Sequence, residues 1–330
     1  MPAALPERVR TWAEALAPQA VVHVTAIGGG ITNTKWLVRL ADGDSLVLRW
    51  SDPAVWDGTG REHVRREALA CLLLAGSALP VPRLIASDLD GATAGPANLM
   101  TWRPGRVRLD RLEPAAITAL AQLAAAVHRQ PVPAEHQPPT FSFRGPTEPK
   151  VPSWARWPGL WRQAIDLRAA GLPPTPYGLL HRDFHLGNIL WQNDTVTGLI
   201  DWAEASWGPP NLDVAHICSD FAMLHTTADV ETFRAAYVRQ GGQLDRDPDA
   251  ARFWVVIDIL GFLPDPAHIL AAVASSRPDL SPGIIRRGLE DLLAVTRLSV
   301  LGHDVRRGLS HSQLGKCLQT GRRAWPTRHE

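Results

Sequence analysis

Short apolar, β-rich segments separated by turn residues fill most of the first hundred positions. The segments cover residues 21–27, 35–40, 45–50, 80–85 and 97–102. An Asp42-Gly43 turn between the second and third segments predicts a β-hairpin. Apolar residues at helical spacing over 61–75, followed by Gly76, predict one helix in this region. We therefore expect a small antiparallel sheet with one helix.

Beyond residue 103 the apolar positions follow the 3.6-residue period of helices. Helices are predicted over 114–128, 154–170, 228–240, 250–263 and 283–301, and the proline-rich stretch 130–152 predicts a surface loop. Two apolar runs around Asn193-Asp194 predict a second hairpin. The pattern indicates an α+β fold with an N-terminal lobe over residues 1–102 and a larger, mainly helical lobe over residues 103–330.

Composition narrows the class of protein. The chain has 330 residues, with 34 basic against 33 acidic side chains, and hydrophobic residues make up 45%. Such a balance disfavours nucleic acid as a partner, because phosphate binding needs a basic face. No apolar run is long enough to span a membrane, the N-terminus lacks a signal-peptide pattern, and three cysteines are too few for a disulfide framework or a zinc site. We expect a cytoplasmic protein with no membrane or nucleic-acid partner.

The stretch 178–202 carries the most specific signal for chemistry. Asp183 precedes the second hairpin, Asn188 enters it and Asp201 leaves it. A carboxylate on a loop can orient a substrate hydroxyl and accept its proton, while an amide and a second carboxylate offer hard oxygen ligands to Mg²⁺. The pattern His-x-Asp-x₄-Asn occurs by chance only about 0.01 times in such a chain. The alternative is a surface loop with a helix-capping aspartate.

This stretch resembles the catalytic loop and metal-binding strand of the aminoglycoside phosphotransferase/choline kinase-like family, small-molecule kinases built on the protein-kinase fold. The resemblance spans roughly residues 20–300 and is strongest over 178–216. It implies a bilobal protein-kinase-like fold, Mg²⁺, and ATP or GTP as co-substrate. It also implies that Asp183 is the catalytic base, that Asn188 and Asp201 bind the metal, and that His181 supports the loop. For His185 both loop support and a role in the site stay open.

The N-terminal lobe matches the same family. Residues 28–34 are similar to its phosphate-covering loop, and residues 99–102 to the linker that holds the nucleotide base. Arg49 occupies the position where protein kinases place a phosphate-contacting lysine, and Glu67 resembles its ion-pair partner, with Glu62 as the alternative. None of the three lysines (Lys35, Lys150 and Lys316) falls at that position. The residues implied in nucleotide binding are Gly29, Gly30, Thr32, Asn33, Thr34, Arg49, Glu67, Met100 and Trp102.

Departures from the family pattern bear on the substrate. Arg182 stands where a small residue is usual and makes the tripeptide 181–183 similar to that of protein kinases. Trp202, however, follows Asp201 in place of Phe-Gly, and nothing resembles an activation loop; these two features favour a small-molecule kinase over a protein kinase. From residue 220 onward 13 acidic and 14 basic side chains nearly balance, so no acidic excess supports a polycationic acceptor. Asp258 is either a substrate contact or a capped or exposed helix residue.

The acceptor expected is a hydroxyl of an aminoglycoside- or macrolide-like antibiotic or of a small metabolite. The alternative function is that of a catalytically silent, kinase-like protein that binds nucleotide or ligand. A monomer and a homodimer are both compatible with the sequence.

Overall fold

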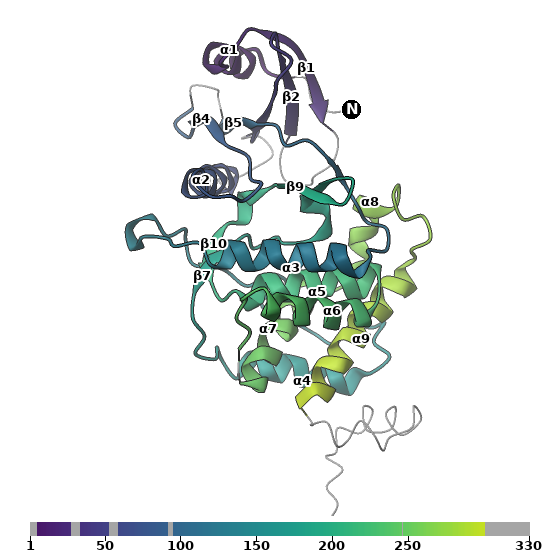
Figure 1. Cartoon of the computed structure of the whole chain (residues 1–330). Coiled ribbons are helices and arrows are strands. Elements are labelled where there is room, and N and C mark those ends of the chain that lie inside the picture. The colour runs from purple at the N-terminus through teal and green to yellow at the C-terminus, as the bar shows by residue number, and fades with distance from the viewer. Residues whose placement is uncertain (1–4, 28–33, 53–58, 92–94, 246, 301–330) are drawn as a thin grey trace, which may run out of the picture. The chain divides into compact units, whose positions relative to one another are not determined.

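A computed structural model describes residues 5–27, 34–52, 59–91, 95–245 and 247–300 (Figure 1). The chain divides into two compact units. Unit 1 consists of Met1–Leu109, Gln122–Phe141 and Gly178–Gly208, and unit 2 of Asp110–Ala121, Ser142–Tyr177 and Pro209–Glu330. The lobe boundary expected after residue 102 stays a prediction.

Unit 1 begins with helix α1 (Glu7–Leu16), which the sequence pattern did not predict, and a five-stranded antiparallel sheet. Its strands are β1 (Val21–Ile27), β2 (Thr34–Leu40), β3 (Ser45–Trp50), β4 (Leu84–Asp88) and β5 (Ala97–Thr101), in the order β1-β2-β3-β5-β4. The predicted small antiparallel sheet is confirmed. β4 starts later than expected because Pro80 and Pro82 lack the N–H groups that a ladder needs.

The two faces of this sheet differ in chemistry. One face carries a buried apolar cluster, which Val9 and Ala13 of α1 cover; its sheet residues include Trp36, Val38, Leu40, Leu46, Leu48, Trp50 and Leu99. The other face packs against α2 (Thr59–Leu73), where the Cys71 sulfur lies 3.9 Å from that of Met100. Successive strand residues point to opposite faces, so residues 35, 49 and 98 share the α2 side.

The rest of unit 1 is a set of short strands: β6 (Arg106–Val107), β7 (Gly178–Leu180), β8 (Ile189–Gln192), β9 (Thr195–Leu199) and β10 (Ser206–Gly208). β6, β8 and β9 form one antiparallel sheet, and β10 returns to pair with β7. The predicted hairpin is confirmed as β8–β9, and Asn193 turns it with a left-handed φ of 53°.

Unit 2 is helical. Its helices are α4 (Pro158–Ala169), α5 (Asn211–Leu224), α6 (Thr227–Arg239), α7 (Pro248–Gly261), α8 (Leu270–Val273) and α9 (Pro282–Val300), with a 3₁₀ turn at Pro266–Ile269. Helix α3 (Pro114–His128) contributes to both units, and Ala134–His136 forms a 3₁₀ turn in unit 1.

In unit 2, helices α5 and α4 differ from the sequence prediction for physical reasons. α5 was missed because every one of its residues is buried, the polar ones included, so it lacks the solvent-facing side that marks a surface helix. α4 begins at Pro158, not at residue 154, because a residue before proline is driven out of the helical region; Trp157 has φ −124° and ψ 72°. Trp154 and Trp161 still meet edge to face at 5.2 Å, with Trp161 fully buried.

No single helix among the residues described is long and apolar enough to cross a membrane. The helical segments Asp249–Gly261 and Pro266–Val273 reach the length and apolar composition of a membrane span only when they are taken together. The two segments are bent by 69° relative to each other.

Candidate active site

Three polar side chains form a row across the α2 side of the sheet. Arg49 on β3 lies directly opposite Lys35 on β2 and opposite Asn98 on β5. Directly opposed residues in antiparallel strands point to the same face, so the three side chains are neighbours. Arg49 and Asn98 are buried, at 2% and 0% exposure. A buried polar row on a sheet needs charged or hydrogen-bonding partners from outside the sheet.

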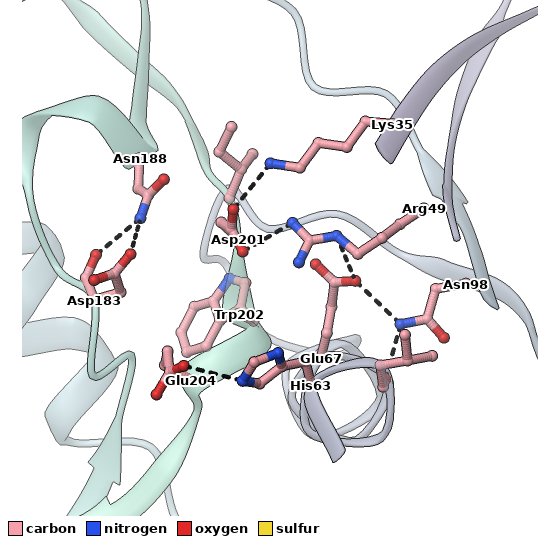
Figure 2. A network of polar contacts seen from close by, with 12 residues as sticks. Lys35, Arg49, His63, Glu67, Asn98, Asp183, Asn188, Asp201, Trp202 and Glu204 are labelled. Atoms are coloured by element: carbon pink, nitrogen blue, oxygen red, sulfur yellow. Dashed lines mark hydrogen bonds and ion pairs between the residues drawn. The ribbon is translucent and has the colours of Figure 1, made fainter. Parts of the chain in front are cut away.

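Arg49 finds two such partners, as Figure 2 shows. Its Nε lies 3.3 Å from Oε2 of Glu67 on α2, and its Nη2 lies 2.8 Å from Oδ1 of Asp201. The amide of Asn98 donates to the same Glu67 oxygen at 3.1 Å and to the Val64 carbonyl at 2.9 Å. Glu67 is therefore the partner of Arg49, whereas Glu62 pairs with Arg65 and Arg66 on the helix surface.

Burial and charge act in opposite directions on these groups. Burial opposes ionisation of Asp201, but the positive charges of Arg49 and Lys35 outweigh it and hold the pKa of Asp201 well below its usual range. For Arg49 burial is likewise outweighed by Asp201 and Glu67, so its pKa is raised. Burial raises the pKa of Glu67, and the charge of Arg49 offsets this in part. Asp201 and Arg49 thus stay charged at neutral pH.

Lys35 is a site residue that the sequence reasoning missed. Its Nζ donates to Oδ2 of Asp201 at 2.9 Å, so the two oxygens of this carboxylate meet two different cations. Lys35 could have been found from the register of the β2–β3 hairpin. In this register the numbers of paired residues add to 84, as for Lys35 and Arg49. A loop of four residues, 41–44, would instead have paired Lys35 with Trp50 and put it on the other face.

Helix α2 also holds the segment that follows Asp201. His63 Nε2 lies 3.2 Å from Oε1 of Glu204, and Arg66 donates to the Ala205 carbonyl and to the Ser206 hydroxyl at 3.2 and 2.9 Å. Residues Trp202–Glu204 form a 3₁₀ turn directly after Asp201. Helix α2 thus positions Glu67 and also holds residues 204–206, which follow Asp201 in the sequence.

The expected catalytic base and one expected metal ligand are in direct contact. Asn188 Nδ2 donates to the Asp183 backbone carbonyl at 2.9 Å and to its Oδ2 at 3.0 Å (Figure 2). The Asp183 side chain is 28% exposed, so it remains open to solvent or substrate. Because its amide nitrogen is used in this way, Asn188 has its Oδ1 directed away from Asp183.

His181 supports the loop from within. It is fully buried, packs on the Trp202 ring at 4.5 Å, and its Nδ1 accepts from the Asp183 backbone N–H at 3.3 Å. Nε2 therefore carries the proton and donates to the Ile200 carbonyl at 2.9 Å. His181 links the residues next to Asp201 with the backbone of Asp183.

His185 contacts both the loop backbone and Asp183. Its Nδ1 accepts from the Gly187 N–H at 3.1 Å and caps the 3₁₀ turn Leu186–Asn188, while Nε2 lies 3.5 Å from Oδ2 of Asp183. The ring thus supports the loop and faces the carboxylate at once. Gly187 permits this, because a Cβ there would lie 2.6 Å from the imidazole.

Two residues of this region adopt left-handed backbone conformations. Arg182 has φ 68° and Asp201 has φ 66°. Such a conformation costs a residue other than glycine about 1–2 kcal/mol. Strained backbone of this kind is concentrated at functional sites, where the surrounding contacts maintain it.

The donor set near Asp201 fits a magnesium ion. The Ile200 N–H donates to the Asn188 carbonyl at 3.0 Å, so Asn188 and Asp201 start and end the same hairpin side by side. Both offer oxygen, the ligand that Mg²⁺ prefers, and Mg²⁺ commonly takes only one or two protein carboxylates beside substrate phosphates. The part of the chain that the structure describes contains no cluster of three His, Cys, Asp or Glu residues that would suit other metals.

The remaining nucleotide-site residues are placed only in part. Gly29, Gly30, Thr32 and Asn33 lie outside the described residues, and Thr34 starts β2. Met100 lies inside β5 with its side chain 3% exposed, so it is a sheet residue. The chain leaves the sheet only at Trp102, which is 37% exposed.

Asp258 lies in unit 2, on α7, and is buried in a polar cluster. Its Oδ1 is 3.0 Å from Nδ1 of His216, and its Oδ2 accepts from the Ser219 hydroxyl at 2.7 Å. Both partners belong to α5, so the carboxylate joins two helices. These contacts account for a charge on an apolar helix, and a role in substrate binding stays a prediction.

Comparison with known proteins gives one family match and several similar structures. The profile of the phosphotransferase enzyme family (APH) matches residues 23–254, while no curated protein matches the chain. Solved structures are similar at low identity. Macrolide 2'-phosphotransferase MphH from Brachybacterium faecium has 20% identity and a TM-score of 0.51, covering 80% of this chain and 96% of its own.

Two other solved structures have higher TM-scores. Aminoglycoside phosphotransferase APH(4)-Ia has 16% identity and a TM-score of 0.55, covering 86% of this chain and 96% of its own. Amicoumacin kinase hAmiN, in complex with AMP-PNP, Ca²⁺ and Ami, has 15% identity and a TM-score of 0.55, covering 87% and 93%. These likenesses confirm the expected α+β, protein-kinase-like fold. With a profile match over more than half of its length, the chain belongs to the phosphotransferase enzyme family.

Proposed function

We propose that this protein transfers the γ-phosphate of ATP or GTP to a hydroxyl group of an antibiotic or a small metabolite in the cytoplasm. The observation that carries the proposal is the convergence on one hairpin of the Asp183 carboxylate, the Asn188 amide and the Asp201 carboxylate, with Asp201 held ionised by two cations. Phosphoryl transfer depends on positioning and on charge stabilisation, and this arrangement supplies both.

In the proposed reaction Asp183 accepts the proton of the acceptor hydroxyl on a carboxylate oxygen. The hydroxyl oxygen forms a bond to the γ-phosphorus while the bond to the β-phosphate oxygen breaks, and the nucleoside diphosphate leaves with that electron pair. Asn188 orients Asp183 through its Nδ2. Asn188 Oδ1 and Asp201 would hold Mg²⁺, which neutralises charge on the phosphates. Arg49 and Glu67 keep Asp201 in place.

The similar structures suggest which acceptors to test first. A thermostable APH(4)-Ia mutant was solved with ADP and hygromycin B, MphH is a macrolide 2'-phosphotransferase, and hAmiN is an amicoumacin kinase. The purified protein is incubated with Mg²⁺ and γ-labelled ATP or GTP, together with these antibiotics and with hydroxyl-bearing metabolites such as choline. Label transfer to one compound class identifies the acceptor.

Two variants test the assigned base. Asp183→Ala is expected to abolish transfer and to leave nucleotide affinity within a few-fold. Asp194→Asn is the matched control, because it removes a 97% exposed carboxylate from the turn of the neighbouring hairpin. Wild-type protein that binds nucleotide but neither transfers nor hydrolyses it would favour the catalytically silent alternative. Equal loss of binding and turnover in Asp183→Ala would mean that the base is misassigned.

A further inference from the structure

Lys35 and Arg49 hold the same carboxylate in different ways. Arg49 is buried, with its side chain 3% exposed, and is shared between Asp201 and Glu67. Lys35 has a side chain that is 15% exposed, and within the described residues Asp201 is the partner of its ammonium group. Arg49 is therefore anchored by two carboxylates, whereas Lys35 has a flexible side chain that contacts one carboxylate, that of Asp201.

The Asp201 oxygen that Lys35 contacts is also the oxygen left to bind the metal under the proposed function. Under the proposed function Asp201 is a metal ligand, and its Oδ1 is already paired with Nη2 of Arg49 at 2.8 Å. The remaining oxygen, Oδ2, accepts the Lys35 ammonium at 2.9 Å. A divalent cation approaching this oxygen meets a positive charge within hydrogen-bonding distance of it, and two cations this close repel each other.

We propose that Lys35 is a second phosphate-binding cation of the nucleotide site, and that it exchanges Asp201 for the nucleotide phosphates when metal and nucleotide bind. The inference rests on the proposed function and adds a residue on β2 to it. Lysine suits this task because its ammonium is a compact charge on a flexible stem, while the planar guanidinium of Arg49 is fixed by its two partners.

This exchange couples the two ligands. Metal alone has to displace Lys35 from Asp201, and nucleotide alone has to draw Lys35 away from the Asp201 carboxylate. When both bind, Lys35 moves to the phosphates and Asp201 becomes open to the metal, so each ligand strengthens the binding of the other. Without Lys35, metal alone binds more tightly and nucleotide alone binds more weakly.

The test measures binding in the full-length protein, without turnover. Mn²⁺ serves as the metal probe, followed by electron paramagnetic resonance without nucleotide, and metal-free ATP binding is followed by calorimetry. In Lys35→Met we expect Mn²⁺ alone to bind several-fold more tightly and metal-free ATP to bind roughly tenfold more weakly, as for the loss of one charge-assisted hydrogen bond. The enhancement of ATP binding by Mn²⁺ is expected to shrink. Lys35→Arg, which keeps the charge, should restore most of the ATP affinity.

Arg39→Met is the matched control. Arg39 lies on β2 four residues after Lys35, on the same face, and is exposed. Arg39→Met therefore removes one positive charge without affecting the contacts of Asp201. If Lys35→Met matches Arg39→Met in both affinities, the role of Lys35 is rejected. Lys35→Gln serves the same comparison if Lys35→Met unfolds. Wild-type protein that binds ATP with the expected coupling but transfers no phosphate would reject the proposed function and leave the assignment of Lys35 standing.

Discussion

Lys35 on β2 and Arg49 on β3 lie directly opposite each other, and their side chains reach the two oxygens of the Asp201 carboxylate. Two cations on adjacent strands thus converge on one anion that comes from a distant part of the chain. Together with Glu67, they form a group of two positive and two negative charges whose sum is zero. The loss of one member leaves the others unbalanced in a buried setting, which makes the group sensitive to single substitutions.

Arg49→Lys is expected to weaken this group although the charge is kept. A single ammonium cannot reach Glu67 and Asp201 with the fork geometry of Nε and Nη2. We expect the free energy of unfolding to fall by about 1–3 kcal/mol and nucleotide affinity to fall several-fold; urea titration and calorimetry measure the two effects. Arg39→Lys is the control on an exposed position. Unchanged stability and affinity in Arg49→Lys would mean that arginine stands there only because the chain is poor in lysine.

Gly187→Ala is expected to slow turnover without affecting nucleotide binding. The new Cβ would lie 2.6 Å from Cε1 of His185, so the ring has to move away from its contacts with the loop and Asp183. Misplacing the base lowers kcat by roughly 10- to 100-fold. Steady-state kinetics with the identified acceptor measure this effect. Gly76→Ala, where no atom lies within 4 Å of the new Cβ, should behave like wild type. A wild-type kcat in Gly187→Ala would mean that His185 does not help to position Asp183.

Asp201→Asn is expected to change how stability depends on pH. The charges of Arg49 and Lys35 hold the pKa of Asp201 in the folded protein below that of an unfolded chain. Ionised Asp201 therefore stabilises the fold above an ordinary carboxyl pKa of about 4, and the contribution is lost as the pH falls below this value towards the folded-state pKa. The difference in unfolding free energy between wild type and Asp201→Asn should be constant from pH 6 to 8 and shrink below pH 4.

Urea unfolding at a series of pH values gives this difference directly. Asp194→Asn, in the exposed turn, is the control and should show little difference at any pH, since exposed ion pairs contribute little. A difference for Asp201→Asn that stays constant down to pH 3 would contradict the proposed electrostatic origin.

Gly288→Ala tests the packing of unit 2. Replacing glycine by alanine inside a helix ordinarily stabilises it by up to about 1 kcal/mol. At Gly288 on α9, however, a Cβ would lie 2.0 Å from the Ala222 carbonyl oxygen on α5, so the two helices have to separate. We expect destabilisation by about 2 kcal/mol or more, seen in thermal unfolding. Gly283→Ala on the same helix meets only ordinary contacts and should be neutral or stabilising. Similar effects of the two substitutions would contradict the close approach of α5 and α9.

The β8–β9 hairpin and the residues that flank it could be predicted from sequence because their signals are local. Asp183 and Asn188 lie on one loop, and two short apolar strands with one turn separate Asn188 from Asp201, so their geometry is set almost without tertiary information. Arg49 and Glu67 were found through resemblance, since a strand-end cation and a helix carboxylate 18 positions apart have no local reason to meet. The helix α5 could not be found from periodicity, because it is buried on all sides.

Lys35 and Asn98 were missed because their place depends on strand register. In the β2–β3 hairpin, Gly43 adopts φ 93° and Leu40 donates to the Asp44 carbonyl, so the loop is one residue shorter than the expected segment 41–44. A shift of one residue reverses the face of every side chain on a strand. The turn chemistry at Gly43 and the alternation of the apolar residues Trp36, Val38 and Leu40 with Lys35 together place Lys35 on the α2 side.

The distance along the chain between Lys35 and Asp201, 166 positions, affects the order of assembly during synthesis. All five strands of the first sheet and α2 lie within the first 101 residues, and they supply Lys35 and Arg49 but only one of the two balancing carboxylates, Glu67. Until the ribosome has made residue 201, this part of the chain holds an excess positive charge where burial is costly. Completion of the sheet's polar face thus waits for a contact between residues far apart in the sequence, and contacts of this kind slow folding.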